Sequence, residues 1–272
     1  MHEALGPRHA KVRELRALAR DPRSRADAAA TLVEGPRVIA AALDRDAPLT
    51  DAYLGYGARH AFGPLVGRLE AAGVPVTDLK EGVLEKIGST RTPQPVLAVA
   101  SWPMSTVADI VRAVTARPGG LFVVTVDVAD PGNLGTIVRS AEAAGAAGVV
   151  VTGDGVDVRS PKVVRSSAGA VFGVPVFEMA DAAAAVATLR EYGVTCLGAV
   201  ATGGQTPDAL ELDGAVAFVV GNEARGLNAP LLGALDGTVT IPMAGSAESL
   251  NVAMATTVLC FEAARQRAAR GR

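Results

Sequence analysis

Residues 130–140, D-P-G-N-L-G-T-I-V-R-S, contain an amide and a guanidinium close to two glycines. Glycines let a ligand approach the backbone closely, and Asn133 stands where a helix N-cap is expected. A helix that begins there carries Arg139 almost two turns further on. Because arginine stays charged at neutral pH, Arg139 gives this segment a fixed positive charge. The alternative is that Asn133 only caps the helix and that Arg139 is a surface charge.

A second cluster of polar residues lies at 219–227, V-V-G-N-E-A-R-G-L, and follows an apolar run. The glycines at 221 and 226 would suffice for a plain turn. Between them stand an amide, a carboxylate (Glu223) and a guanidinium, which a plain turn does not require. This combination favours a binding loop.

The third segment, residues 241–255, reads I-P-M-A-G-S-A-E-S-L-N-V-A-M-A. Ser249 is predicted to cap the final helix, which places Asn251 in its first turn. The apolar residues that follow recur at helical spacing and form a stripe typical of a core or of a subunit interface: Leu250, Met254, Val258 and Phe261.

The second half of the chain alternates apolar, β-branched runs with helical patterns. This alternation predicts an α/β fold with a doubly wound parallel sheet. Ligands bind beyond the carboxyl ends of strands in such sheets, so the loops after these strands are expected to form the site. The segment at 130–140 lacks the G-x-G-x-x-G fingerprint, which disfavours a dinucleotide-dependent enzyme. The predicted strands cover residues 121–128, 148–152, 174–177, 195–200, 215–220 and 238–241, and the predicted helices start near 134 and cover 162–170 and 250–267.

The first hundred residues predict a smaller α/β module in front of this sheet. We therefore expect one domain over residues 1–102, a linker over 103–120 and a second domain over 121–272. The predicted helices of the module cover residues 11–20, 36–43, 58–72 and 81–87, and its predicted strands cover 31–34, 53–55, 74–76 and 96–100.

Composition excludes several other classes of protein. The 272 residues are 49% hydrophobic and 20% charged, an ordinary globular balance. Apolar runs of about eight to ten residues are too short to span a bilayer and no signal peptide is visible, so we expect a soluble, cytoplasmic protein. With three histidines, and with Cys196 and Cys260 in separate apolar contexts, we expect no metal site and two reduced core cysteines.

Charge gives a mixed indication of nucleic-acid binding. The net charge of −2 means that any such affinity must come from a local patch. The first 25 residues carry seven Lys or Arg residues against three acidic residues. Taken alone, this patch is more typical of a solvated helix face.

In order and spacing, the three polar segments closely resemble the three sequence motifs of the SpoU/TrmH family of RNA ribose 2′-O-methyltransferases, part of the SPOUT superfamily. The first family motif matches residues 133–139, the second matches V-G-N-E-A-R-G at 220–226, and the third matches I-P-M and S-L-N-V-A within 241–253. The front module is similar to the family's substrate-binding domain at L-V-E-G-P-R (32–37) and P-Q-P-V-L-A-V (93–99).

This resemblance implies a SPOUT-type C-terminal domain with a trefoil knot, a feature that is rare among proteins in general. It also implies S-adenosylmethionine as the cofactor, held by the backbone at Gly221, Ile241 and Leu250, with Thr202 close by. A side chain at position 221 is expected to block the adenosine.

The resemblance implies as well that a ribose 2′-hydroxyl of ribosomal or transfer RNA attacks the methyl group. Arg139 would stabilise the developing alkoxide or anchor the adjacent phosphate, and either this arginine or a substrate phosphate would take the proton. Asn133 and Asn251 would orient groups in the site, Ser249 would support them, and Glu223 would fix the arginine by a charged hydrogen bond.

The front module would deliver the RNA through phosphate contacts. The family further implies a homodimer in which Arg139 of one subunit lies near the cofactor of the other. The alternative is a non-catalytic RNA-binding protein that keeps the fold, against which the intact motif residues argue. The predicted RNA-binding residues are Arg8, Lys11, Arg13, Arg37 and Arg165, the last with a simple surface charge as its alternative.

Overall fold

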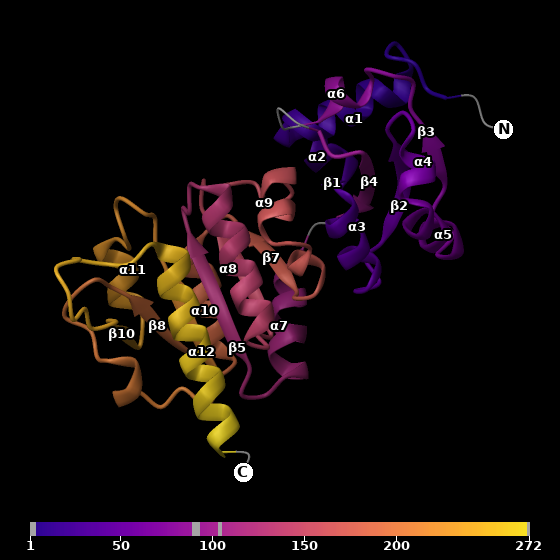
Figure 1. Ribbon diagram of the computed structural model, residues 1–272. Helices are drawn as coiled ribbons and strands as arrows, with labels where there is room; N and C mark the ends of the chain where they lie inside the picture. Colours follow the sequence, from indigo (N-terminus) through magenta and orange to yellow (C-terminus); the bar gives the residue numbers. More distant parts are fainter. Residues whose placement is uncertain (1–3, 89–92, 103–104, 271–272) are drawn as a thin grey trace. The chain divides into compact units, whose positions relative to one another are not determined.

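The computed structural model describes residues 4–88, 93–102 and 105–270. The chain packs into two compact units, each of them α/β (Figure 1). The first consists of Met1–Pro103 and Asp157–Gly173, and the second of Met104–Val156 and Val174–Arg272. The predicted α/β fold class, with a small front unit, is confirmed.

The first unit is built on a four-stranded mixed sheet in the order β1-β4-β2-β3. Strand β4 is antiparallel to β1 and β2, while β3 is parallel to β2. Helix α1 contributes Val12, Leu15 and Leu18 to the core, because their spacing places them on one helix face. The elements of this unit before residue 103 are α1 (Ala10–Arg20), α2 (Pro22–Ala28), β1 (Ala30–Glu34), α3 (Pro36–Leu43), β2 (Leu49–Leu54), α4 (Ala58–Ala61), α5 (Gly63–Ala71), β3 (Val76–Asp78), α6 (Leu84–Ile87) and β4 (Val96–Ser101).

A segment from much later in the sequence completes the first unit. Asp157–Gly173 carries α9 (Pro161–Ser166) and η1 (Ala170–Phe172) and belongs to this unit by its packing. The Thr31 hydroxyl of β1 donates to the carbonyl oxygen of Arg159 at 2.7 Å. Local sequence patterns give no sign that a later segment packs against the first unit. The predicted first domain, residues 1–102, therefore did not include this segment.

The second unit contains a six-stranded, fully parallel sheet in the order β10-β8-β9-β5-β6-β7. From β5 the chain adds β6 and then β7 on one side of this strand. It then crosses over and adds β8, β9 and β10 on the opposite side of β5. The strand order therefore reverses beside β5, where parallel sheets form ligand sites. Its elements are α7 (Val107–Ala116), β5 (Leu121–Val126), α8 (Pro131–Ala143), β6 (Gly148–Thr152), β7 (Val176–Met179), α10 (Ala182–Glu191), β8 (Thr195–Ala199), η2 (Pro207–Ala209), β9 (Val216–Val220), α11 (Ala229–Ala234), β10 (Gly237–Val239) and α12 (Val252–Arg270).

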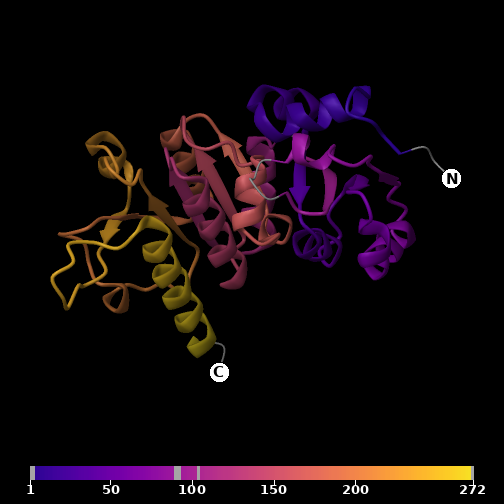
Figure 2. The same cartoon turned by 45° about the horizontal axis from the view of Figure 1, so that its top comes forward.

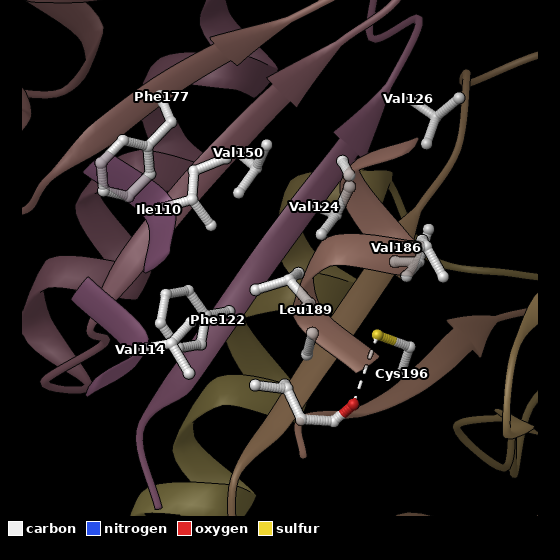
Figure 3. Packing of buried hydrophobic residues seen from close by; sticks show 14 of the residues in the cluster. Ile110, Val114, Phe122, Val124, Val126, Val150, Phe177, Val186, Leu189 and Cys196 are labelled. Carbon is white, nitrogen blue, oxygen red and sulfur yellow. Dashed lines mark hydrogen bonds between the residues drawn. The ribbon is translucent and has the colours of Figure 1, made fainter. Parts of the chain in front are cut away.

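Both faces of this sheet are buried. Figure 3 shows Phe122, Val124 and Val126 of β5 in a cluster with side chains of α7 and α10. Successive side chains of a strand alternate between faces, so the intervening residues of β5, which are also buried, point to the other face. Helices α8 and α12 lie side by side, and both contact the sheet (Figures 1 and 2). The sheet is therefore doubly wound, as predicted.

The stretch predicted as a linker, residues 103–120, contains helix α7. Residues 103 and 104 lie outside the described residues, but Ile110 and Val114 of α7 are buried in the core of the second unit. The helix begins with a capping box between Thr106 and Asp109. Most of this stretch is thus packed structure, because its apolar residues recur at helical spacing.

The two cysteines are free and buried. Burial raises the thiol pKa of both Cys196 and Cys260 to about 12, so neither is a ready nucleophile. The prediction of reduced core cysteines is confirmed. Within the described part of the chain, no helix is both long and apolar enough to cross a membrane.

Candidate functional site

A cavity of about 620 Å³ opens at the carboxyl ends of β8, β9 and β10. Val220, Val239 and Leu259 line it with apolar side chains that are themselves almost fully buried. The loops that follow the three strands supply the polar part of the lining. Apolar walls with a few polar groups are typical of a small-molecule site, and the position agrees with the loops predicted from the sequence.

A chain of hydrogen bonds joins the three predicted motifs beside this cavity. The Asn251 side-chain amide donates to the side-chain oxygen of Asn133 at 3.0 Å, and the Asn133 amide donates to Glu223 at 2.8 Å. Asn251 and Glu223 line the cavity, whereas Asn133, in the first turn of α8, is not among the lining residues. The structure therefore brings these three predicted residues together.

Glu223 fastens its loop to the start of α8. Its carboxylate accepts hydrogen bonds from the backbone N–H groups of Ala129 (3.1 Å) and Asp130 (3.2 Å) as well as from Asn133. Burial acts to raise the pKa of Glu223, but these hydrogen bonds outweigh it and hold the pKa below its ordinary value of 4.5. The carboxylate was expected to fix an arginine; in the described residues it instead binds Asn133 and two backbone N–H groups.

The helix caps also differ from those predicted. Asp130, not Asn133, caps α8: its carboxylate accepts from the Asn133 backbone N–H at 2.9 Å. At the final helix, the Asn251 side chain accepts from the Ala253 backbone N–H at 2.9 Å, so Asn251 takes the place expected for Ser249. Ser249 is exposed and lines the cavity two residues earlier. Because Asp130 caps α8, the Asn133 side chain is free to join the hydrogen-bond chain, whereas Asn251 caps α12 with its oxygen and donates to Asn133 through its nitrogen.

Gly221 is required by the fold of its own loop. The backbone N–H of Gly226 donates to the Asn222 carbonyl at 2.8 Å, which returns the chain onto Gly221. A Cβ on Gly221 would overlap the Gly226 carbonyl and lie 2.8 Å from the Leu227 nitrogen. The sequence-based reason for this glycine was space for an adenosine, whereas the structure shows a backbone contact within the loop.

The other predicted cofactor-binding residues divide into two groups. Ile241 and Leu250 line the cavity together with Gly221. For the described residues, the lining includes Ala201 but not its neighbour Thr202, which is exposed in the loop after β8. Three of the four predicted residues thus line the cavity, and Thr202 is adjacent in sequence to a lining residue.

Arg139 is exposed on α8 and does not line the cavity. In the part of the chain that the structure describes, its guanidinium has no hydrogen bond or ion pair. The next residue, Ser140, is 2.6 Å from Thr257 of α12, hydroxyl to hydroxyl. Arg139 is therefore presented at the surface next to the α8–α12 contact.

Two residues of the site were not singled out by the sequence analysis. Asp127 follows β5 with a positive φ of 53°, and its carbonyl accepts from the Asn222 side chain at 2.9 Å. Arg225 lines the cavity on the loop after β9. The sequence signal for Arg225 was its place among the polar residues at 219–227. Asp127 gave no signal, because an aspartate after a strand is ordinary.

The predicted RNA-binding residues lie in the first unit. Arg8, Arg13 and Arg37 are exposed. Lys11 is paired with Glu14 (3.4 Å) and Asp51 (3.9 Å), which locally offset the positive charge of its ammonium group.

Arg165 is less accessible than expected of a surface charge. Its guanidinium donates to Glu34 at 2.6 Å, and the Glu34 side chain is only 1% exposed. Arg165 therefore has a partner inside the first unit. No group of three or more His, Cys, Asp or Glu residues that could hold a metal occurs among the described residues.

The fold and the site define an α/β protein with a cavity of about 620 Å³ at the carboxyl edge of a parallel sheet. The SpoU rRNA Methylase family model matches residues 120–261, and the MRM3-like substrate binding domain model matches residues 9–98. The chain belongs to the SpoU rRNA Methylase family. The predicted resemblance is confirmed, and the protein is an S-adenosylmethionine-dependent RNA methyltransferase.

Relatives agree over nearly the whole chain. An uncharacterized tRNA/rRNA methyltransferase of Mycobacterium tuberculosis H37Ra is 32% identical over 270 residues, covering 97% of this chain and 82% of the relative. The crystal structure of the SpoU methyltransferase AviRb from Streptomyces viridochromogenes, in complex with S-adenosylmethionine, matches with a TM-score of 0.84 and 31% identity, covering 96% and 99% of the two chains. A crystal structure described as an RNA 2′-O ribose methyltransferase matches with a TM-score of 0.78 and 30% identity, covering 98% and 100%. The trefoil knot stays a prediction drawn from the family.

Proposed function

We propose that the protein methylates a ribose 2′-hydroxyl of ribosomal or transfer RNA in the cytoplasm. The observation that carries this proposal is the hydrogen-bond chain from Asn251 through Asn133 to Glu223, which joins all three motifs at one cavity. The relative described as an RNA 2′-O ribose methyltransferase, which spans the same two units, supports the choice of the ribose. The relative from Mycobacterium tuberculosis carries both RNA classes in its description.

The cavity suits the cofactor. Its apolar lining from Val220, Val239 and Leu259 offers a surface for a nucleobase, and backbone groups at Gly221, Ile241 and Leu250 would hold the adenosine. Thr202, next to the lining residue Ala201 in the loop after β8, would lie close to the cofactor. When bound, S-adenosylmethionine supplies an electrophilic methyl group.

The side chains of the site would orient the hydroxyl and stabilise its negative charge. A ribose hydroxyl is a weak nucleophile at neutral pH and must be aligned and helped to deprotonate. Arg139 would stabilise the alkoxide or anchor the adjacent phosphate, because its guanidinium is exposed and unpaired within the described residues. Asn133 and Asn251 hold each other and would orient the reacting groups, Ser249 would support them from the cavity wall, and Glu223 holds Asn133 in place.

The first unit would bind the RNA. Arg8, Arg13 and Arg37 are exposed and have no ion-pair partner in the described part of the chain, so their charge is available to phosphates. Lys11 would contribute less because two carboxylates already surround it. Arg165 would touch RNA only with the third of its side chain that is exposed, and its pairing with Glu34 favours a structural role.

A homodimer is part of this proposal. Helix α12 exposes an apolar stripe, and a terminal helix with such a face needs a cover. Arg139 lies on α8, directly beside α12. If a second copy packs against this surface, Arg139 of the first copy would lie near the cavity of the second. The stripe consists of Met254, Val258 and Phe261, which are 61%, 43% and 49% exposed. Leu250, predicted to share this helix, is 37% exposed but lies just before α12, which begins at Val252.

The proposal is tested with total RNA from a host strain that lacks the gene. Purified protein and methyl-labelled S-adenosylmethionine are added, and the RNA is hydrolysed with alkali. A 2′-O-methyl group blocks hydrolysis at its own phosphodiester, so the label is expected in an alkali-resistant dinucleotide. Label on a free, alkali-released nucleotide would show base methylation and overturn the proposal. Arg139→Ala is the control for catalysis by this site, with an expected loss of at least about a hundredfold.

A further inference from the structure

Arg225 is the one positively charged residue lining the cavity in the described part of the chain. Its side chain is exposed, and within the described residues it has no hydrogen bond or ion pair. Most other arginines of the second unit have such partners: Arg190 pairs with Asp236 at 2.7 Å, and Arg270 pairs with Asp213 at 2.6 Å. Arg225 therefore brings an uncompensated charge to the mouth of the site.

The backbone that carries Arg225 is nevertheless firmly held. The Asn222 side-chain oxygen accepts from the backbone N–H groups of Ala224 (3.0 Å) and Arg225 (3.1 Å). The carbonyl of Asn222 accepts from Gly226, which adopts a φ of 64° that suits glycine. At the same time Glu223 is bonded to the start of α8. The loop thus fixes the backbone of Arg225, while its guanidinium has no partner within the described residues. This combination is expected of a residue that binds a ligand.

We propose that Arg225 binds the RNA phosphate next to the target ribose. This inference rests on the proposed ribose methylation. A 2′-hydroxyl lies one carbon away from the 3′-phosphodiester, so any nucleotide that places this hydroxyl at the cavity brings an anion to its mouth. The planar guanidinium fork matches phosphate oxygens with two hydrogen bonds. The nearby carboxylate of Glu223 does not compete, because α8 already occupies it.

The cofactor carboxylate is the competing anion. Arg225 is less suited to binding this carboxylate. The apolar residues that suit the cofactor's nucleobase, Val220 and Leu259, are 1% exposed, whereas Arg225 is exposed. The RNA must enter from the exposed side. Arg225 would then position the acceptor ribose, while Arg139 acts at the reacting hydroxyl.

The test compares wild type, Arg225→Ala and Arg225→Lys on total RNA from the host lacking the gene. Filter binding of this RNA and its methylation are each measured over a series of KCl concentrations, and S-adenosylmethionine binding is measured by calorimetry. Arg112→Ala is the matched control, since Arg112 is an exposed arginine whose guanidinium already pairs with Asp109 on its own helix. Thermal unfolding checks that each variant folds.

For Arg225→Ala we expect kcat/KM for RNA to fall about tenfold to a hundredfold, with cofactor affinity within about twofold of wild type. The slope of log kcat/KM against log salt is expected to become shallower by about 0.7 to 0.9, the contribution of one phosphate contact. Arg225→Lys keeps the slope but loses part of the rate, because an ammonium group lacks the fork. A tenfold loss of cofactor affinity would assign Arg225 to the cofactor instead, and an unchanged rate and slope would also overturn the proposal. If wild type itself leaves no alkali-resistant label, the proposed function has failed rather than this inference.

Discussion

Asn251 donates its side-chain amide to the side-chain oxygen of Asn133, so the N-terminus of α12 is tied to the first turn of α8. The two residues are 118 positions apart in the sequence. Each makes a further hydrogen bond: Asn251 caps α12, and Asn133 donates to Glu223. Each amide is thus used at both its oxygen and its nitrogen. The arrangement fixes the position of the cavity wall relative to α8, the helix that carries Arg139.

Replacing Glu223 by Gln is expected to lower the methyl-transfer rate about tenfold. The carboxylate accepts from three donors, whereas Gln offers one acceptor and turns an N–H group toward a donor. In the native state the pKa of Glu223 lies below 4.5, so its contribution is present above this pH and is lost as the pH falls through the lowered pKa. Single-turnover rates measured from about pH 5 to about pH 8 should therefore keep a constant ratio of wild type to variant.

The control for this variant is Glu262→Gln, which removes a carboxylate paired with Arg265 on α12, away from the cavity lining. It is expected to leave the rate within about twofold of wild type. A ratio of wild type to Glu223→Gln that changes steadily between pH 5 and pH 8 would mean that the carboxylate titrates in this range and takes part as an acid or base.

Gly221→Ala is expected to destabilise the second unit by about 1–3 kcal/mol and to weaken cofactor binding. Its Cβ would overlap the Gly226 backbone, which cannot move without breaking the loop. Gly233→Ala in α11 is the matched control, because nothing lies within 4 Å of its Cβ. Alanine there is expected to leave stability unchanged or to raise it by up to about 1 kcal/mol. Urea unfolding and calorimetry measure both variants, and equal behaviour of the two would contradict the steric argument.

Much of the fold was readable from local pattern, because buried parallel strands and amphipathic helices leave a strong periodic signal. The buried strand β5 and the helix α3 after Gly35-Pro36 are examples. Caps were less certain, because several residues near each helix start could serve. Pro131 at the first position of α8 was the available signal for Asp130 as the cap.

Contacts distant in sequence could not be predicted. The bond between Asn133 and Glu223 spans 90 residues, and the pair of Glu34 with Arg165 spans 131. Motif resemblance placed the residues of the first pair in one site but gave them different partners. For the second pair it gave no indication, because a buried carboxylate and its arginine leave no periodic pattern.

Arg165→Ala is expected to destabilise the first unit by about 3 kcal/mol, because it removes a partner of a buried carboxylate. Arg68→Ala serves as the control: its bond to Asp44 has the same length, 2.6 Å, but both side chains are exposed. The loss there is expected to be below about 1 kcal/mol. Urea unfolding gives both values. Equal small losses, together with weaker RNA binding by Arg165→Ala alone, would instead assign Arg165 to the RNA interface.

The apolar stripe of α12 is expected to form the dimer interface. Met254→Glu places a charge at its most exposed position and is expected to convert a dimer at micromolar concentration into a monomer. Val107→Glu on α7 is the control, since Val107 is a similarly exposed apolar residue, 48% accessible, on a different helix. Sedimentation equilibrium distinguishes these outcomes, and a monomeric wild-type protein would exclude the interface.

If Arg139 acts on the partner's cavity, two inactive variants are expected to complement each other. Ala201→Trp fills the mouth of the cavity and leaves Arg139 intact, whereas Arg139→Ala leaves the cavity intact. In a mixed dimer, one site then combines an intact arginine with an intact cavity. Random exchange of equal amounts makes half of the dimers mixed, each with one of two sites restored, which gives roughly a quarter of the wild-type rate. If Arg139 served the cavity of its own chain, no mixed dimer would contain a complete site, and proven subunit exchange without recovered activity would rule out the shared site.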